Sequence, residues 1–366
     1  MDPLTHTLTG AALSRAGLRR HTALATATLV IAANAPDIDI LTAARGEYAS
    51  LAMRRGITHG PLAMLALPFV VAGVMLAYDR LWRRRRNPGA EPARPLPLLL
   101  LAFLGTLTHP LLDWLNTYGI RLLMPFSPRW FYGDALFIID PWLWLLLGGA
   151  LAIAARGPES VLWIALAGLT STAVLLAPQV PAGARVTWLA ALAVVAVMAW
   201  LWRRRSGGNA GRVVRAGVLC GGTYILLMIG SDRLARAETL RVAQAAGIDA
   251  RAVMVAPEPA DPFAASIVVQ GPDAYHRGSF DWRRRPHVRW DEPAIPLGAR
   301  DGAAATAMRT PDAQDFLTWS RFPFTEVAVD SGGATVRIAD ARYPKFFGGL
   351  GGVTVRVPAS AEPPVR

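Results

Sequence analysis

The chain has 366 residues, of which 53% are hydrophobic and 17% are charged, and its formal net charge is +12. Soluble domains carry about 25% charged residues, so this composition argues against a soluble globular protein and favours a membrane protein. The single cysteine, Cys220, lies in an apolar segment, which argues against structural disulfides and thiol chemistry.

Two short apolar segments come first, at residues 4–16 and 22–35, with Arg15, Arg19 and Arg20 between them. Each is shorter than the ~20 residues that cross a bilayer upright, so we expect a helical hairpin packed against other helices. No basic segment precedes the first run and arginines interrupt the pair, so a cleavable signal peptide is not expected.

Six longer apolar segments follow, each near or above spanning length. They are residues 60–82, 96–114, 136–155, 161–177, 186–202 and 213–229. Arginines cluster at 83–86 and at 203–205, and the positive-inside rule places both loops in the cytoplasm. Four predicted spans separate these loops, an even number that returns the chain to the same side. The arginines are therefore interpreted as topology signals, and no nucleic-acid partner is expected.

The last third of the chain has a different pattern. From about Arg233 it lacks long apolar runs and gains proline, glycine and short alternating segments at 266–270, 335–338 and 353–357. The predicted fold class is therefore mainly α, a polytopic membrane helical bundle (residues 1–232) with a small C-terminal β-rich extramembrane domain (residues 233–366). The span count places that domain outside the cytoplasm.

Histidine and aspartate motifs recur in the first third of the chain. Three of the six histidines follow a threonine, and aspartates occur in the motifs Pro-Asp-Ile-Asp and His-Pro-Leu-Leu-Asp. The predicted topology brings all of these residues to the outer side. Such residues are rare within a membrane without a partner, and together they supply the ligands that borderline divalent metals prefer. The predicted metal ligands are His6, Asp37, Asp39, His59, His109 and Asp113.

Local spacing agrees with a shared site. His109 and Asp113 are four residues apart, so a helix presents both on one face, and Pro110 between them favours a kink. Each motif alone also has a structural explanation. His6 could be an interfacial histidine, the two aspartates after Pro36 could cap a turn, and His109 with Asp113 could be a helix-stabilising contact. Their common location favours the metal site.

Three further residues have predicted catalytic roles. Asp39 or Asp134, whichever carboxylate is not taken up by metal, is the candidate general base. Arg55, four residues before His59, is the candidate group for binding an anion or orienting a carboxylate. Asp134 and Asp140 could equally support the site or cap a helix.

The order of these motifs resembles a known family. His6-Thr7-Leu8-Thr9-Gly10, Pro36-Asp37-Ile38-Asp39, Arg55-Gly56-Ile57-Thr58-His59, residues 109–119, Pro125-Phe126 and Asp140-Pro141 occur in the order seen in the YdjM-like bacterial inner-membrane proteins. That family is described as metal-dependent hydrolases, mostly by inference. The resemblance implies a multi-pass inner-membrane protein with a divalent metal, for which zinc fits the ligand set. A more distant similarity to zinc-dependent phospholipase C and P1-type nucleases implies phosphoester cleavage.

Two functional hypotheses follow. The first is a membrane-bound, metal-dependent hydrolase of a phosphoester or other ester at the outer face, with membrane lipid as its partner and a lipid or phosphoester as substrate. The alternative is a non-enzymatic transporter or assembly factor in which buried His and Asp residues relay ions. A transporter is expected to show broken helices in two corresponding halves, whereas here the polar residues are confined to the first third. This favours the enzyme.

Overall fold

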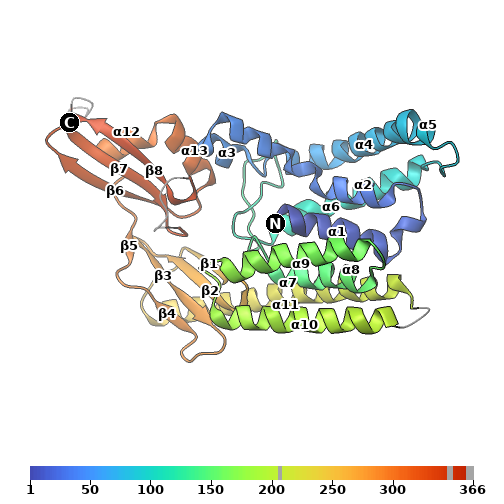
Figure 1. Ribbon diagram of the computed structural model, residues 1–366. Coiled ribbons are helices and arrows are strands. Elements are labelled where there is room, and N and C mark those ends of the chain that lie inside the picture. The colour runs from blue at the N-terminus through green and yellow to red at the C-terminus, as the bar shows by residue number, and fades with distance from the viewer. Residues whose placement is uncertain (205–207, 344–348, 360–366) are drawn as a thin grey trace. The chain divides into compact units, whose positions relative to one another are not determined.

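The computed structural model describes residues 1–204, 208–343 and 349–359 (Figure 1). Its contacts define two compact units. The membrane unit contains Met1–Ile38, Arg55–Asp232 and Ala256–Pro262. The sheet unit contains Asp39–Arg54, Arg233–Val255 and the chain from Phe263 onward. The sequence predicted a single domain boundary between residues 232 and 233. The structure differs, because Asp39–Arg54, which lies between two apolar helices, belongs to the sheet unit.

The membrane unit is helical. Its helices are α1 (Pro3–Ala16), α2 (Ala25–Asn34), α4 (Pro61–Tyr78), α6 (Pro95–Trp114), α7 (Pro141–Leu143), α8 (Gly149–Ala154), α9 (Glu159–Leu176), α10 (Ala182–Arg204) and the first part of α11 (Ala210–Ala245). Six segments of the described chain are long and apolar enough to cross a membrane, namely Ala25–Arg45, Pro61–Arg86, Pro95–Trp114, Glu159–Leu176, Ala182–Arg204 and Ala210–Ala245. The predicted polytopic helical bundle is confirmed.

Two apolar segments differ from their predicted lengths. The helix expected over 136–155 is Pro141–Ala154, because the chain leaves α6 in a loop and the Asp140 carboxylate caps the new helix. Its 14 residues extend only about 21 Å. The second N-terminal segment is longer than expected, because a 3-10 segment, η2 (Ala35–Arg45), continues α2 and gives a candidate span of 21 residues. The even span count depends on the short helix, so the orientation of the chain stays a prediction.

Small residues bring three helices of the membrane unit close together. A β-carbon at Gly10 of α1 would lie 2.8 Å from the Leu29 carbonyl oxygen, and one at Gly105 of α6 would lie 2.9 Å from the same oxygen. Helices α1 and α6 therefore approach α2 at backbone distance, as glycines permit between membrane helices. Because His6 is one turn from Gly10 and His109 one turn from Gly105, the same packing brings both histidines toward the end of α2.

The sheet unit contains two antiparallel sheets. One has strands β1 (Ala252–Glu258), β2 (Asp261–Gln270), β3 (Ala274–Asp281) and β4 (Val288–Trp290) in that order, with β5 (Ile295–Pro296) paired to β3. The other has β6 (Pro323–Asp330), β7 (Gly333–Asp340) and β8 (Val353–Pro358). The unit also contains the helices α12 (Gly302–Met308), α13 (Pro311–Trp319) and α3 (Glu47–Met53) and the last part of α11. The three strands predicted from the sequence lie inside β2, β7 and β8.

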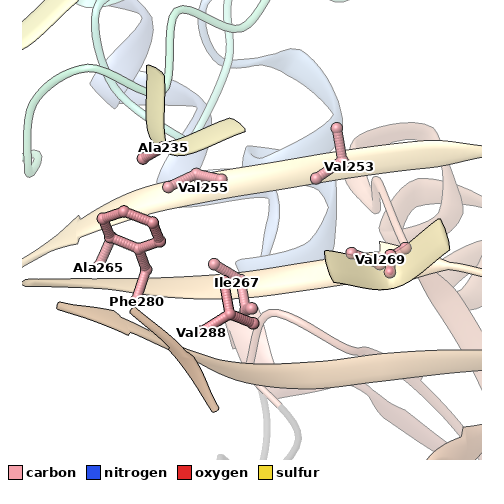
Figure 2. Close-up of a cluster of buried hydrophobic side chains, with 9 residues drawn as sticks. Ala235, Val253, Val255, Ala265, Ile267, Val269, Phe280 and Val288 are labelled. Atoms are coloured by element: carbon pink, nitrogen blue, oxygen red, sulfur yellow. The ribbon is translucent and has the colours of Figure 1, made fainter. Parts of the chain in front are cut away.

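Apolar side chains that alternate along the strands form the core of the first sheet. Ala265, Ile267 and Val269 of β2 project from one face and pack with Phe280 of β3 (Figure 2). In the same unit, α3 packs against α13, and the Tyr48 hydroxyl donates a hydrogen bond of 3.0 Å to a backbone carbonyl before β8. Residues 39–54 therefore contribute to the fold of the C-terminal third.

Candidate metal centre

Four side chains of the membrane unit converge on one point. Asp37 lies in η2, His59 ends the short 3-10 helix η3 (Ile57–His59), and His109 and Asp113 are one turn apart on α6. Their ligand atoms all lie within 4.8 Å of one another, and this group could hold a metal ion. His59, His109 and Asp113 are fully buried, whereas the Asp37 side chain is 16% exposed. Access from outside is therefore at Asp37.

The spacing of the ligand atoms fits a small divalent cation. The Nε2 atoms of His59 and His109 are 3.1 Å apart, and Oδ2 of Asp113 lies 3.4 and 3.5 Å from them. Oδ1 of Asp37 lies 3.7 Å from Nε2 of His109. Tetrahedral zinc with bonds of about 2.0–2.1 Å separates its ligand atoms by about 3.3–3.4 Å. The four measured separations, 3.1–3.7 Å, lie on either side of this ligand spacing.

Hydrogen bonds at the far side of each imidazole orient these nitrogens. Nδ1 of His109 lies 2.7 Å from the Ala33 carbonyl oxygen, which can only accept, so Nδ1 carries the proton and Nε2 keeps its lone pair. Nδ1 of His59 lies 2.9 Å from the Thr58 hydroxyl, which can accept in the same way. With Thr58 as the acceptor, both Nε2 atoms carry a lone pair, and a cation between them would satisfy both.

Arg55 holds the carboxylate of Asp113. Its Nε lies 3.0 Å from Oδ2, and its terminal nitrogen donates to the Asn116 side chain at 2.8 Å. Its guanidinium also lies over the Tyr118 ring, 4.7 Å from the centroid. Of the two roles predicted for Arg55, orientation of a carboxylate is the one this geometry supports. The Met1 amino group forms a further ion pair with Oδ1 of Asp113.

His6 lies against the four-residue group without belonging to it. Its ring stacks on His109 with centroids 3.8 Å apart and planes at 15°, and it is fully buried. Its Nε2 lies 3.3 Å from Oδ1 of Asp113. Neither ring nitrogen has a hydrogen-bond partner among the described residues. The structure thus brings His6 to the centre, and its role as a ligand stays a prediction.

The remaining predicted residues are not members of the four-residue group. Asp39 belongs to the sheet unit, where its Oδ1 is 3.7 Å from Nε of Arg54. Asp134 is fully buried in the loop after α6, with a positive φ of 52°. Their roles as ligand or general base stay predictions. Asp140 is a helix cap, because one of its oxygens accepts bonds of 3.0 Å from two backbone amides at the start of α7.

Several supporting residues were missed from the sequence. Thr58 directly precedes His59 and Asn116 follows Asp113 by three residues, so proximity to the motifs was the available signal. The Ala33 carbonyl carried no signal, because backbone contacts of this kind depend on how α2 and α6 pack.

These features define a class of protein, a multi-pass membrane protein with a buried His/Asp cluster that could bind a metal. Residues 1–203 match the model of the YdjM inner membrane protein family, and the chain belongs to that family. It is therefore a multi-pass inner-membrane protein, as predicted.

One curated relative is similar over part of the chain. The uncharacterized protein YfhP of Bacillus subtilis (strain 168) is 25% identical over 175 residues, which cover 45% of this chain and 50% of the relative. The chain thus spans about half the length of this relative. No solved structure matches the chain significantly.

Proposed function

We propose that this protein is a membrane-bound, metal-dependent hydrolase that cleaves a phosphoester or other ester at the outer face of the inner membrane, with zinc as its metal. The observation that supports the proposal best is the spacing of the four ligand atoms, 3.1–3.7 Å between the measured pairs, around two imidazole nitrogens of matching orientation.

Each residue of the centre has a role in the proposal. Asp37, His59, His109 and Asp113 would hold the cation, and His6 is the additional ligand candidate. A divalent cation at such a site acts as a Lewis acid, polarising an ester oxygen and lowering the pKa of a bound water toward about 7. Asp39 or Asp134 would accept the proton of the attacking water.

Charge and access favour an anionic substrate. A divalent cation at the centre would attract a negatively charged phosphoester oxygen, while Arg55, engaged with Asp113, would hold that carboxylate in place. The partly exposed Asp37 is on the side from which a substrate would arrive. A phosphoester headgroup at the membrane boundary meets both conditions.

The test begins with metal content. Protein purified in detergent should contain stoichiometric zinc by elemental analysis, and His109→Ala and Asp113→Ala should lose it. His21→Ala replaces an exposed histidine of the same unit and should keep it. Thermal unfolding of each variant separates loss of ligand from loss of fold.

Activity is measured on a phospholipid, a model phosphodiester and a carboxylic ester. Hydrolysis should disappear on chelation, return with zinc and be absent in both ligand variants. Turnover that persists in those variants would show that another site is the catalyst. Tight metal binding with every substrate intact would instead support the transporter or assembly factor.

A further inference from the structure

An apolar groove runs between two helices of the membrane unit and ends at the candidate metal centre. Helices α2 and α4 lie side by side in Figure 1, and a cavity of about 600 Å³ separates parts of them. Asp37 lines this cavity and also belongs to the four-residue metal group. The groove and the centre thus share Asp37.

The floor and the rim of the groove differ in exposure. Val71 and Met75 form a buried floor, and both belong to the hydrophobic core between α2, α4 and α6. The rim contains Ile31, Val70 and Val74, which are 48%, 58% and 60% exposed. Both helices lie in candidate spans, so the rim faces lipid and the groove opens sideways into the bilayer.

The polarity of the groove has a direction. Apart from Asn34 and Asp37, its lining is apolar. Asn34 is the last residue of α2, and α4 begins at Pro61, two residues after His59, so the polar end is the end at the metal centre. The apolar part follows α4 from Leu67 to Met75, about 12 Å at 1.5 Å per residue.

We propose that this groove, the α2–α4 groove, binds an acyl chain of a membrane lipid, with the lipid's polar headgroup at Asp37. The rim residues lie in candidate membrane spans, so hydrocarbon would surround them, and the apolar part of the lining offers no polar group to any other occupant. The inference rests on the proposed function in one respect: if the centre is hydrolytic, its substrate is an acylated amphiphile whose headgroup ester is held beside Asp37.

Binding is tested by photo-crosslinking, which needs no turnover. The protein is placed in nanodiscs of phosphatidylethanolamine and phosphatidylglycerol that contain phosphatidylglycerol with a diazirine near the end of one acyl chain. Adducts should concentrate on Ile31, Val70 and Val74. The double variant Val70→Trp, Val74→Trp fills the groove and should lower them. Leu65→Trp is the matched control, because Leu65 is on α4 outside the groove and is 60% exposed in the native protein. It should leave the yield of adducts unchanged. Adducts spread evenly over Leu65 and the groove would overturn the proposal.

Hydrolysis then separates this inference from the proposed function. The groove-filling variant should keep its zinc and its turnover of a short, water-soluble phosphodiester. Its turnover of the long-chain lipid should fall by about tenfold, as expected when about two methylene groups lose apolar contact. Equal turnover of the lipid by this variant and Leu65→Trp would contradict the groove. Groove adducts without hydrolysis of any substrate would refute the hydrolase and leave the lipid site standing.

Discussion

Each unit of the molecule contains a buried aspartate paired with an arginine, and the two pairs differ in what else surrounds the carboxylate. Asp340 of the sheet unit binds Arg342 through both oxygens at 3.0 Å. It also accepts bonds from the Ser320 hydroxyl at 2.7 Å and from three backbone amides at 2.8–3.2 Å. This carboxylate is saturated by hydrogen-bond donors of the protein.

Asp113 of the membrane unit has different neighbours. Besides Arg55 and the Met1 amino group, the groups close to it are the imidazoles of His6, His59 and His109, at 3.3–3.5 Å. An unprotonated imidazole nitrogen does not stabilise a carboxylate, whereas a shared cation would stabilise both. The comparison teaches that ion pairing alone does not identify a functional carboxylate. The nature of the remaining neighbours does.

The largest effect should come from removing the charge of Asp113. Asp113→Asn keeps the size of the side chain, and we expect metal affinity to fall by more than about 100-fold, beyond the range for residues that only support a ligand. Zinc retained against a competing chelator measures it. Asp291→Asn changes an exposed aspartate of the sheet unit and should have no effect. Full zinc retention by Asp113→Asn would remove the distinction between the two aspartates.

The corresponding change in the sheet unit should affect stability and not metal. Asp340→Asn leaves the buried Arg342 without its counter-charge, a loss of about 3–5 kcal/mol for buried pairs. Hydrogen exchange of β6, β7 and β8 should accelerate while zinc content stays at the native value. Loss of zinc in this variant would show that the two aspartates do not act independently.

A smaller effect is expected from the hydroxyl that orients His59. Thr58→Val keeps the shape of the side chain and removes the partner of Nδ1, so zinc affinity should fall by about 10–100-fold. Thr58→Ser restores a hydroxyl and should recover most of the affinity. If valine and serine behave alike, the hydrogen bond does not set the tautomer.

The smallest expected effect is on the acid dependence of unfolding of the sheet unit. Burial raises the pKa of Asp340, but Arg342 and the hydrogen bonds lower it more, so its pKa in the folded protein is below the ordinary value. The stabilisation is therefore complete above the unfolded pKa of about 3.9 and is lost as the pH falls toward the folded value. Thermal unfolding of the sheet unit should be less pH-dependent below about pH 4 in Asp340→Asn than in the native protein. An identical acid dependence would assign the effect to other carboxylates.

The lengths of the apolar helices were predicted only in part from the sequence. Apolar runs of about 20 residues predicted most helices, because bilayer thickness sets a length that composition reveals. The length of the helix from Pro141 was overestimated, since the apolar residues 136–139 lie in a loop, where Leu136 packs against Leu112 of α6. An apolar run looks the same in sequence whether it forms a membrane helix or a buried loop, and only the fold distinguishes the two.

The sequence by itself determined the membrane class, the alternating strands of the last third and four side chains that meet, Asp37, His59, His109 and Asp113. These follow from composition, from the period of apolar residues along the chain and from ligand chemistry, which are local properties. The tertiary structure decided that Asp39 joins the sheet unit, that Arg55 faces Asp113 and that the Ala33 carbonyl orients His109. The contact of His109 with Ala33 depends on how closely α1 and α6 approach α2 at Gly10 and Gly105, and no local pattern fixes that distance.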